Sequence, residues 1–99
     1  MATSQKSSGG AWTDAEKLAI WNKGSLITGY TSESWRRDRC GESMKFSDYG
    51  NRDEDKRGWE IDHINPISNG GGDEIGNLQP IYWENNMAKG DKLNWQCGQ

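Results

Sequence analysis

The sequence predicts an α+β domain, because strand-like and helix-like patterns occupy separate stretches of one short chain. Residues 59–63, Trp-Glu-Ile-Asp-His, alternate with the period of two that is typical of a strand with two unlike faces. A second short strand is expected at 78–81, and the composition of 82–89 is helical up to Gly90. With 99 residues, the chain has room for one domain.

The apolar content is low for a folded domain. Hydrophobic residues make up 31% of the chain, which includes six tryptophans, so we expect a thin core built largely on aromatic rings. No apolar run approaches the roughly 20 residues of a membrane span. The first ten residues are polar where a secretory signal would be apolar. These features predict a soluble, cytoplasmic protein without a membrane partner.

The N-terminal part is expected to brace the later elements. Residues 1–11 are rich in Ser and Gly and are predicted to be a flexible tail, followed by a single domain over 12–99. A capping box at 13–16 predicts a helix over 14–23, with Gly24 as a left-handed stop. The segments expected next are a short helical turn at 33–37, a turn at Cys40-Gly41, an extended segment through Met44 and Phe46, and a solvated loop at 50–58.

The net charge of −3 argues against strong, sequence-blind binding to nucleic acid. Residues 59–99 carry two lysines against six acidic residues, which favours a bound cation there. Between 35 and 58, interleaved acidic residues leave two interpretations for a basic run: contacts to a nucleic-acid backbone, or a mixed solvated surface. This run consists of Arg36, Arg37, Arg39, Arg52, Lys56 and Arg57.

Asp62 and His63 are adjacent at a predicted strand end, and the side-chain amide of Asn86 follows on the predicted helix. A carboxylate can bind a hard cation, and histidine exchanges a proton near neutral pH. Because adjacent strand residues face opposite ways, both can line one site only if the backbone twists or bulges there. Asn65-Pro66, directly after them, is compatible with such a distortion.

The stretch 58–91 resembles the HNH endonuclease family, whose ββα-metal motif joins two short strands and a helix around one divalent ion. The resemblance rests on the Asp62-His63 pair, Pro66 three residues after His63, a Gly-Gly loop, the pair Asn77-Leu78, and Asn86 and Lys89 of the helix. It implies a ββα-metal unit at about 58–93 in the C-terminal half, braced by the N-terminal helix and an irregular aromatic-rich segment.

The resemblance implies a role for each matching residue. Asp62 and Asn86 would be metal ligands, and His63 the general base that deprotonates a water. Asn77 would hold the loop and help to set the tilt of His63, a structural role, and Lys89 would contact phosphate. Asn86 stands where the family name has histidine, which favours Mg²⁺ or Mn²⁺.

Two of these assignments have competitors. Asn85 replaces Asn86 if the helix register shifts by one residue. Glu60 shares the strand phase of Asp62 and either assists the metal or is an ordinary solvated or salt-bridged carboxylate.

The two cysteines, Cys40 and Cys97, are too few for a disulfide-dense scaffold and, with one histidine, cannot complete a four-ligand zinc site in one chain. They are predicted to be free thiols, with a bridge as the alternative. Many HNH relatives carry Cys-x-x-Cys pairs that bind zinc, but Arg37 and Ser43 stand where a partner of Cys40 would fall. No structural zinc is therefore expected, and tryptophan packing would hold the N-terminal part.

The function expected from the resemblance is a Mg²⁺- or Mn²⁺-dependent endonuclease that hydrolyses phosphodiester bonds, with DNA favoured over RNA as the substrate. The alternative is a catalytically idle HNH-like module that binds nucleic acid or a protein partner. A redox or zinc protein that uses the two cysteines fails on ligand count unless two chains share the metal. One domain offers one active site, so cutting both strands would need a dimer, two visits or a partner protein.

Overall fold

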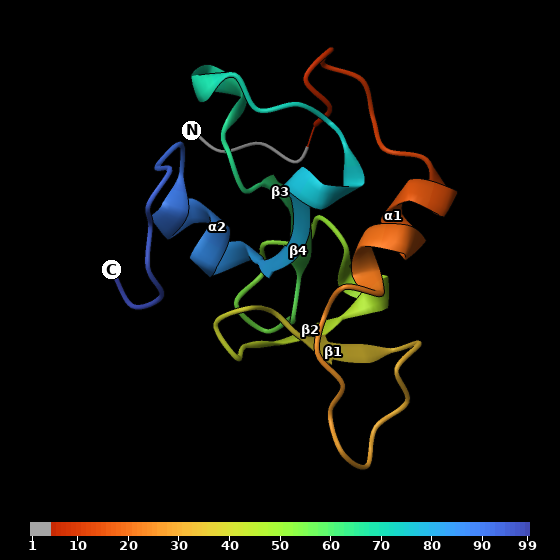
Figure 1. The fold of residues 1–99 in the computed structure, drawn as a ribbon. Helices are drawn as coiled ribbons and strands as arrows, with labels where there is room; N and C mark the ends of the chain where they lie inside the picture. Colours follow the sequence, from red (N-terminus) through yellow and green to blue (C-terminus); the bar gives the residue numbers. More distant parts are fainter. Residues whose placement is uncertain (1–4) are drawn as a thin grey trace.

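The structure, a computed structural model, describes residues 5–99. Two helices flank the larger of two small antiparallel sheets (Figure 1). The elements are α1 (Asp14–Trp21), β1 (Trp35–Arg37), β2 (Ser43–Lys45), β3 (Trp59–His63), β4 (Leu78–Tyr82) and α2 (Trp83–Lys89), with short 3-10 turns at Phe46–Asp48, Ile67–Asn69 and Ile75–Asn77. This mixture confirms the predicted α+β class and contains a strand–strand–helix unit near the C-terminus.

Helix α1 begins where the capping box predicts and ends at Trp21, two residues before the predicted end. The Thr13 hydroxyl accepts from the Glu16 amide, and the Glu16 carboxylate accepts from the Thr13 amide. Asn22 is the C-cap in a right-handed conformation, and Gly24 has no positive φ, so the predicted left-handed stop is wrong. Gly24 instead permits a close approach, because a Cβ placed there would lie 3.0 Å from the Arg36 Cβ.

The predicted helical turn at 33–37 is also wrong, because Trp35–Arg37 forms strand β1. Trp35 lies opposite Lys45 of β2, and the Arg37 amide and carbonyl exchange hydrogen bonds of 2.9 Å with Ser25. The extended segment predicted through Phe46 ends at Lys45. The backbone groups of β1 are thus satisfied by pairing with β2 and with Ser25, and this pairing outweighs the local helical pattern.

Strands β3 and β4 form a regular ladder of five residue pairs, with Trp59 opposite Tyr82 and His63 opposite Leu78. The two strands and the following helix occur where the sequence predicts them, with β4 one residue longer. Each residue of this ladder has a single partner, so β3 contains no bulge at Asp62.

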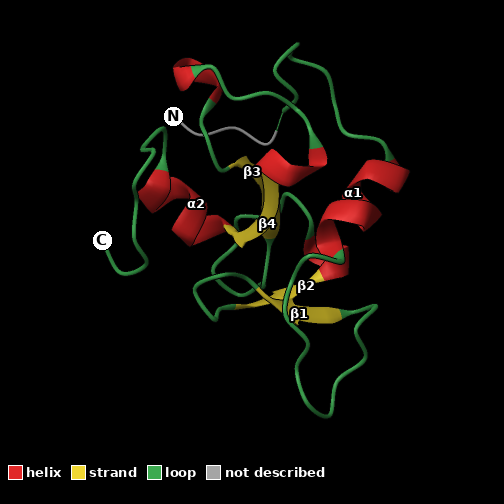
Figure 2. Ribbon diagram, viewed as in Figure 1, coloured by secondary structure: helices red, strands yellow, loops and turns green. Residues whose placement is uncertain are grey.

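The two faces of this sheet differ in character, and a helix lies on each side of it (Figure 2). On one face Trp59 packs against Trp21 of α1, with ring centroids 5.0 Å apart. The other face carries Glu60 and Asp62 and is covered by α2. The aromatic-rich core that the composition predicts includes Trp21 and Trp59 of the first face, and it consists of Trp12, Ile20, Trp21, Met44, Trp59, Ile61, Leu78, Tyr82 and Trp83.

Cys40 and Cys97 form a disulfide, so the predicted free thiols are wrong. Their Cα atoms lie 5.5 Å apart although 57 positions separate them in sequence. Arg39 adds a second link, because it donates to the Trp95 carbonyl at 2.7 Å and lies over the Trp95 ring. Sequence spacing alone could not reveal this pairing, since it depends on the C-terminal segment returning to the turn after β1.

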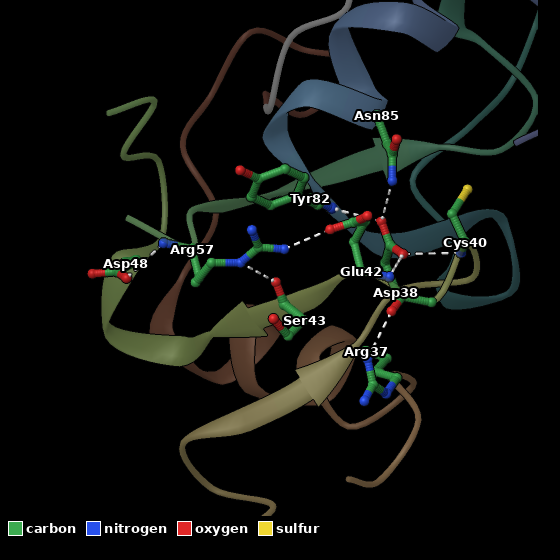
Figure 3. A network of polar contacts seen from close by, with 10 residues as sticks. Arg37, Asp38, Cys40, Glu42, Ser43, Asp48, Arg57, Tyr82 and Asn85 are labelled. Atoms are coloured by element: carbon green, nitrogen blue, oxygen red, sulfur yellow. Dashed lines mark hydrogen bonds and ion pairs between the residues drawn. The ribbon is translucent and has the colours of Figure 1, made fainter. Parts of the chain in front are cut away.

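A buried carboxylate joins the same turn to α2 (Figure 3). Asp38 Oδ1 accepts from the amides of Cys40 and Glu42, and Oδ2 accepts from the Tyr82 amide and the Asn85 side chain, at 2.9–3.0 Å. Four donors compensate for the burial of this charge. The β1–β2 hairpin is therefore attached to the strand–strand–helix unit by the disulfide and the Asp38 hydrogen bonds in addition to aromatic packing.

Residues 1–4 of the predicted tail lie outside the described residues. In the described remainder, Lys6 pairs with Glu16 at 2.9 Å, and Ser7 donates to Asp73. Across residues 5–99, no helix is long and apolar enough to cross a membrane.

Replacing Asp38 tests its role as the link to α2. Asp38→Ala should lower the free energy of unfolding by at least about 3 kcal/mol, because four donors lose a charged acceptor. Urea denaturation followed by tryptophan fluorescence measures this. The matched control, Asp55→Ala in the exposed 50–58 loop, should change stability by less than about 0.5 kcal/mol. Equal denaturation midpoints for the two variants would contradict this role of Asp38.

Candidate active site

Asp62 lies on the face of β3 that α2 covers. Its Oδ2 atom accepts from Gln79 Nε2 at 2.9 Å and lies 3.2 Å from the ammonium of Lys89. Burial raises the pKa of Asp62, against the opposing effects of the Gln79 hydrogen bond and the Lys89 charge. Positive charge next to this carboxylate is therefore favourable.

Lys89 is directed inward from α2. Its side chain is 1% exposed, and Nζ donates to the Asp62 carboxylate and to the His63 carbonyl at 3.0 Å. The resemblance implies a phosphate contact for this lysine, whereas here it neutralises Asp62. The positive charge beside Asp62 is therefore supplied by the Lys89 ammonium group.

Asn86 is fully buried one turn earlier on α2. Its Nδ2 donates to Glu60 Oε1 at 2.7 Å. Because an ionised carboxylate can only accept, the amide nitrogen must face Glu60, and this fixes which atom is the oxygen. The Oδ1 atom is buried without a hydrogen-bond partner among the described residues.

This open oxygen distinguishes Asn86 from the other unpartnered buried atoms of residues 5–99. Those are the indole nitrogens of Trp12, Trp83 and Trp95, which are donors and cannot hold a cation. An amide oxygen and a carboxylate are the donor types that Mg²⁺ and Mn²⁺ prefer. Asp62 and Asn86 therefore fit a hard divalent cation by the chemistry of their donors.

Glu60 forms a salt bridge, which was one of the two roles considered for it; the other was to assist the metal. Arg52 donates to both carboxylate oxygens, at 2.6 and 2.8 Å. The same carboxylate receives the Asn86 amide, so Glu60 orients Asn86. Asn85, the rival to Asn86, donates instead to Asp38.

His63 points away from Asp62, as alternation along a regular strand requires. Its ring lies 6.0 Å from the Trp12 ring, and Nε2 lies 2.7 Å from Asp73 Oδ1. The Asp73 carboxylate also accepts from the Ser7 amide and hydroxyl. Burial would raise the pKa of Asp73, but the hydrogen bonds from His63 and Ser7 outweigh it and lower that pKa. Asp73 is therefore an anion that holds the His63 ring.

The Asp73 contact also assigns the two ring nitrogens of His63. An ionised carboxylate accepts only, so Nε2 carries the proton of the neutral ring. Nδ1 is then the basic nitrogen.

Asn77 holds the loop that carries Asp73. Its Oδ1 accepts from the Asn65 amide at 2.8 Å, and its Nδ2 donates to the carbonyls of Asn65 and Gly72. Gly71 is required in this loop, because a Cβ there would lie 1.7 Å from the Asn65 carbonyl oxygen. These contacts fix the loop on the His63 side of the sheet.

Sequence reasoning missed Asp73 and Gln79 as neighbours of the candidate residues. Asp73 follows a glycine triplet, and no local pattern assigns it to His63. Gln79 could have been found, because an antiparallel pairing of the two predicted strands in this register places residue 79 opposite residue 62.

In the part of the chain from 5 to 99, no three His, Cys, Asp or Glu side chains gather as a metal site. The pair Asp62 and Asn86 lies outside that pattern, because one of its two donors is an amide. A divalent cation there would complete its coordination with water and substrate oxygens.

Comparison with protein family models assigns the sequence to a known family. The HNH endonuclease family model matches residues 38–92, more than half of the chain. The chain belongs to the HNH endonuclease family. This match confirms the resemblance and indicates a nuclease or nucleic-acid-binding function. Members of the family are generally endonucleases, act on nucleic acids and usually use a divalent metal ion. Searches of curated proteins and of solved structures found no match.

Removing the Lys89 ammonium should strongly destabilise the protein, because this group is the partner of the buried Asp62 carboxylate. Lys89→Met should lower the free energy of unfolding by about 3–5 kcal/mol, because Asp62 stays buried without its partner. The double variant Asp62→Asn with Lys89→Met should recover most of this loss. Thermal melts measure both, with Lys92→Met on the exposed surface as the matched control. A Lys89→Met protein that melts with the control would contradict the pairing.

Proposed function

We propose that this chain is a divalent-metal-dependent endonuclease that hydrolyses phosphodiester bonds in DNA. The observation that supports it most is the buried Asn86 Oδ1, an oriented oxygen without a partner on the same sheet face as Asp62. Burying an unsatisfied acceptor costs about 1–3 kcal/mol, which is a large fraction of the net stability of a small domain with so little apolar material. A ligand role accounts for it.

The metal would be held by Asp62 and Asn86, with Mg²⁺ or Mn²⁺ as the expected ion, and would stabilise charge on the phosphorane and on the leaving 3′ oxygen. His63 Nδ1 takes the proton of the attacking water. Asp73 keeps the Nε2 proton in place and stabilises the imidazolium that forms. The products would be 5′-phosphate and 3′-hydroxyl ends.

The positions of Asp62 and His63 constrain how substrate would lie. Their side chains leave β3 in opposite directions, and β3 ends at His63. Lys89 contacts both the Asp62 carboxylate and the His63 carbonyl, so the polar face extends to that strand end. We therefore propose that the substrate phosphate lies across the end of β3, where Lys89 would turn from Asp62 to contact it.

One observation favours the alternative, a catalytically idle module that binds nucleic acid. Lys89 already neutralises Asp62, and an ion must compete with this ammonium for the carboxylate. A chain in which Lys89 wins this competition would keep the fold and lose metal-dependent chemistry.

Plasmid nicking separates these two functions. The parent protein should nick supercoiled DNA in Mg²⁺ or Mn²⁺ and not in EDTA. His63→Ala should lower the rate at least about 100-fold, because it removes the base. Tryptophan fluorescence verifies that the variant is folded. Absence of nicking by the parent with either ion, on duplex or single strands, or equal rates for the two proteins, would refute the proposed chemistry.

Asp73 should affect the rate without contacting substrate. Asp73→Asn removes the anion that holds Nε2, so kcat should fall at least about tenfold while KM changes little. Asp73→Glu, which restores the carboxylate, should recover part of the rate. Glu74→Gln, the same charge change at an exposed neighbour, is the control. A change confined to KM, or none, would show that Asp73 does not position His63.

A further inference from the structure

A basic hollow of about 240 Å³ lies beside the candidate site, between the end of α1, the β1–β2 hairpin and β4. Lys23, Arg37 and Arg39 line it. One acidic residue, Asp38, also lines it, but its carboxylate is buried and accepts four hydrogen bonds. The hollow therefore carries three positive charges against one buried negative charge, in a chain whose net charge is −3.

The contacts of the three basic residues leave their charge in place. Lys23 donates to the carbonyls of Ile75 and Leu78. Arg37 donates to the Gly41 carbonyl at 2.9 Å, and Arg39 to the Trp95 carbonyl at 2.7 Å. A neutral carbonyl orients a cationic group without cancelling its charge, so these side chains can still attract an anion.

Other arginines of the basic run have structural partners. Arg52 pairs with Glu60, and Arg57 pairs with Glu42 at 2.6 Å. Arg36 donates to three backbone carbonyls, those of Asn22, Gly24 and Ser32. The charge of Arg36 is likewise not cancelled by carbonyls, but Arg36 does not line the hollow, so position is what separates it from Arg37 and Arg39.

Gln79 connects the hollow to the candidate metal ligand. It lines the hollow, and its Nε2 donates to Asp62 at 2.9 Å. An anion in the hollow would therefore lie one side chain away from Asp62. Nucleic-acid strands present a row of phosphates, each with one negative charge, and arginine matches phosphate geometry.

We propose that this hollow binds a backbone phosphate of the DNA strand, next to the phosphate that is cut. The proposal rests on the proposed function and names part of its substrate-binding surface. All three basic side chains are exposed. Arg37 makes the principal contact, because Arg39 also lies over the Trp95 ring and Lys23 donates to two carbonyls, and these two side chains add positive charge.

Fluorescence anisotropy with a labelled DNA duplex tests this subsite. The protein carries His63→Ala to prevent cutting, and affinity is measured in Mg²⁺ over a series of salt concentrations. Arg37→Gln should raise Kd at least about threefold and reduce the slope of log affinity against log salt by about one, as expected for one lost phosphate contact. Arg39→Gln should act in the same direction, and Arg37→Lys should keep the slope.

Lys56→Gln is the matched control, since Lys56 belongs to the same basic run but is exposed in the 50–58 loop outside the hollow. It should leave both affinity and slope unchanged. If Arg37→Gln and Arg39→Gln bind like Lys56→Gln while the parent protein nicks DNA, the subsite is wrong and the proposed function stands. If DNA does not bind and the parent does not nick, the subsite and the proposed function both fail.

Discussion

The β3–β4 ladder is buried on both faces, and one of those faces is charged. Regular antiparallel pairing directs Trp59 and His63 toward α1, and Glu60 and Asp62 toward α2. Helix α2 can pack on that second face only if it supplies polar partners, which it does through Asn86 and Lys89. The candidate site is therefore a consequence of how the sheet is covered.

Burying charged groups costs free energy, and a chain with few aliphatic residues has little apolar burial to compensate. Other contacts offset this cost. Asp38 and the disulfide between Cys40 and Cys97 attach the β1–β2 hairpin and the C-terminal segment to the ladder and α2. Cross-links that span distant positions stabilise a small domain by restricting its unfolded chain. Replacing a buried ion pair by apolar groups of similar size is often neutral or stabilising, so stability alone does not account for the charged layer.

Local pattern was sufficient where the segment itself carries the signal, as a cap or as strict alternation. The capping box located α1, and alternation at 59–63 located β3 and its two unlike faces. Trp35–Arg37 was mistaken for a helical turn because its strand character comes from pairing with Ser25 and β2. The bridge from Cys40 and the contact of Asp73 with His63 were missed for the same reason, since both join segments that only the folded chain brings together.

The central claim is that Asn86 Oδ1 and Asp62 hold a divalent cation, and direct metal binding tests it best. Free Mn²⁺ measured by electron paramagnetic resonance during a protein titration gives stoichiometry and Kd. We expect one Mn²⁺ per chain and at least about tenfold weaker binding in Asn86→Ala, because a ligand is lost. Asn69→Ala, an exposed asparagine in the 64–77 loop, should bind like the parent. No bound Mn²⁺, or equal affinity for Asn86→Ala and Asn69→Ala, would contradict the account.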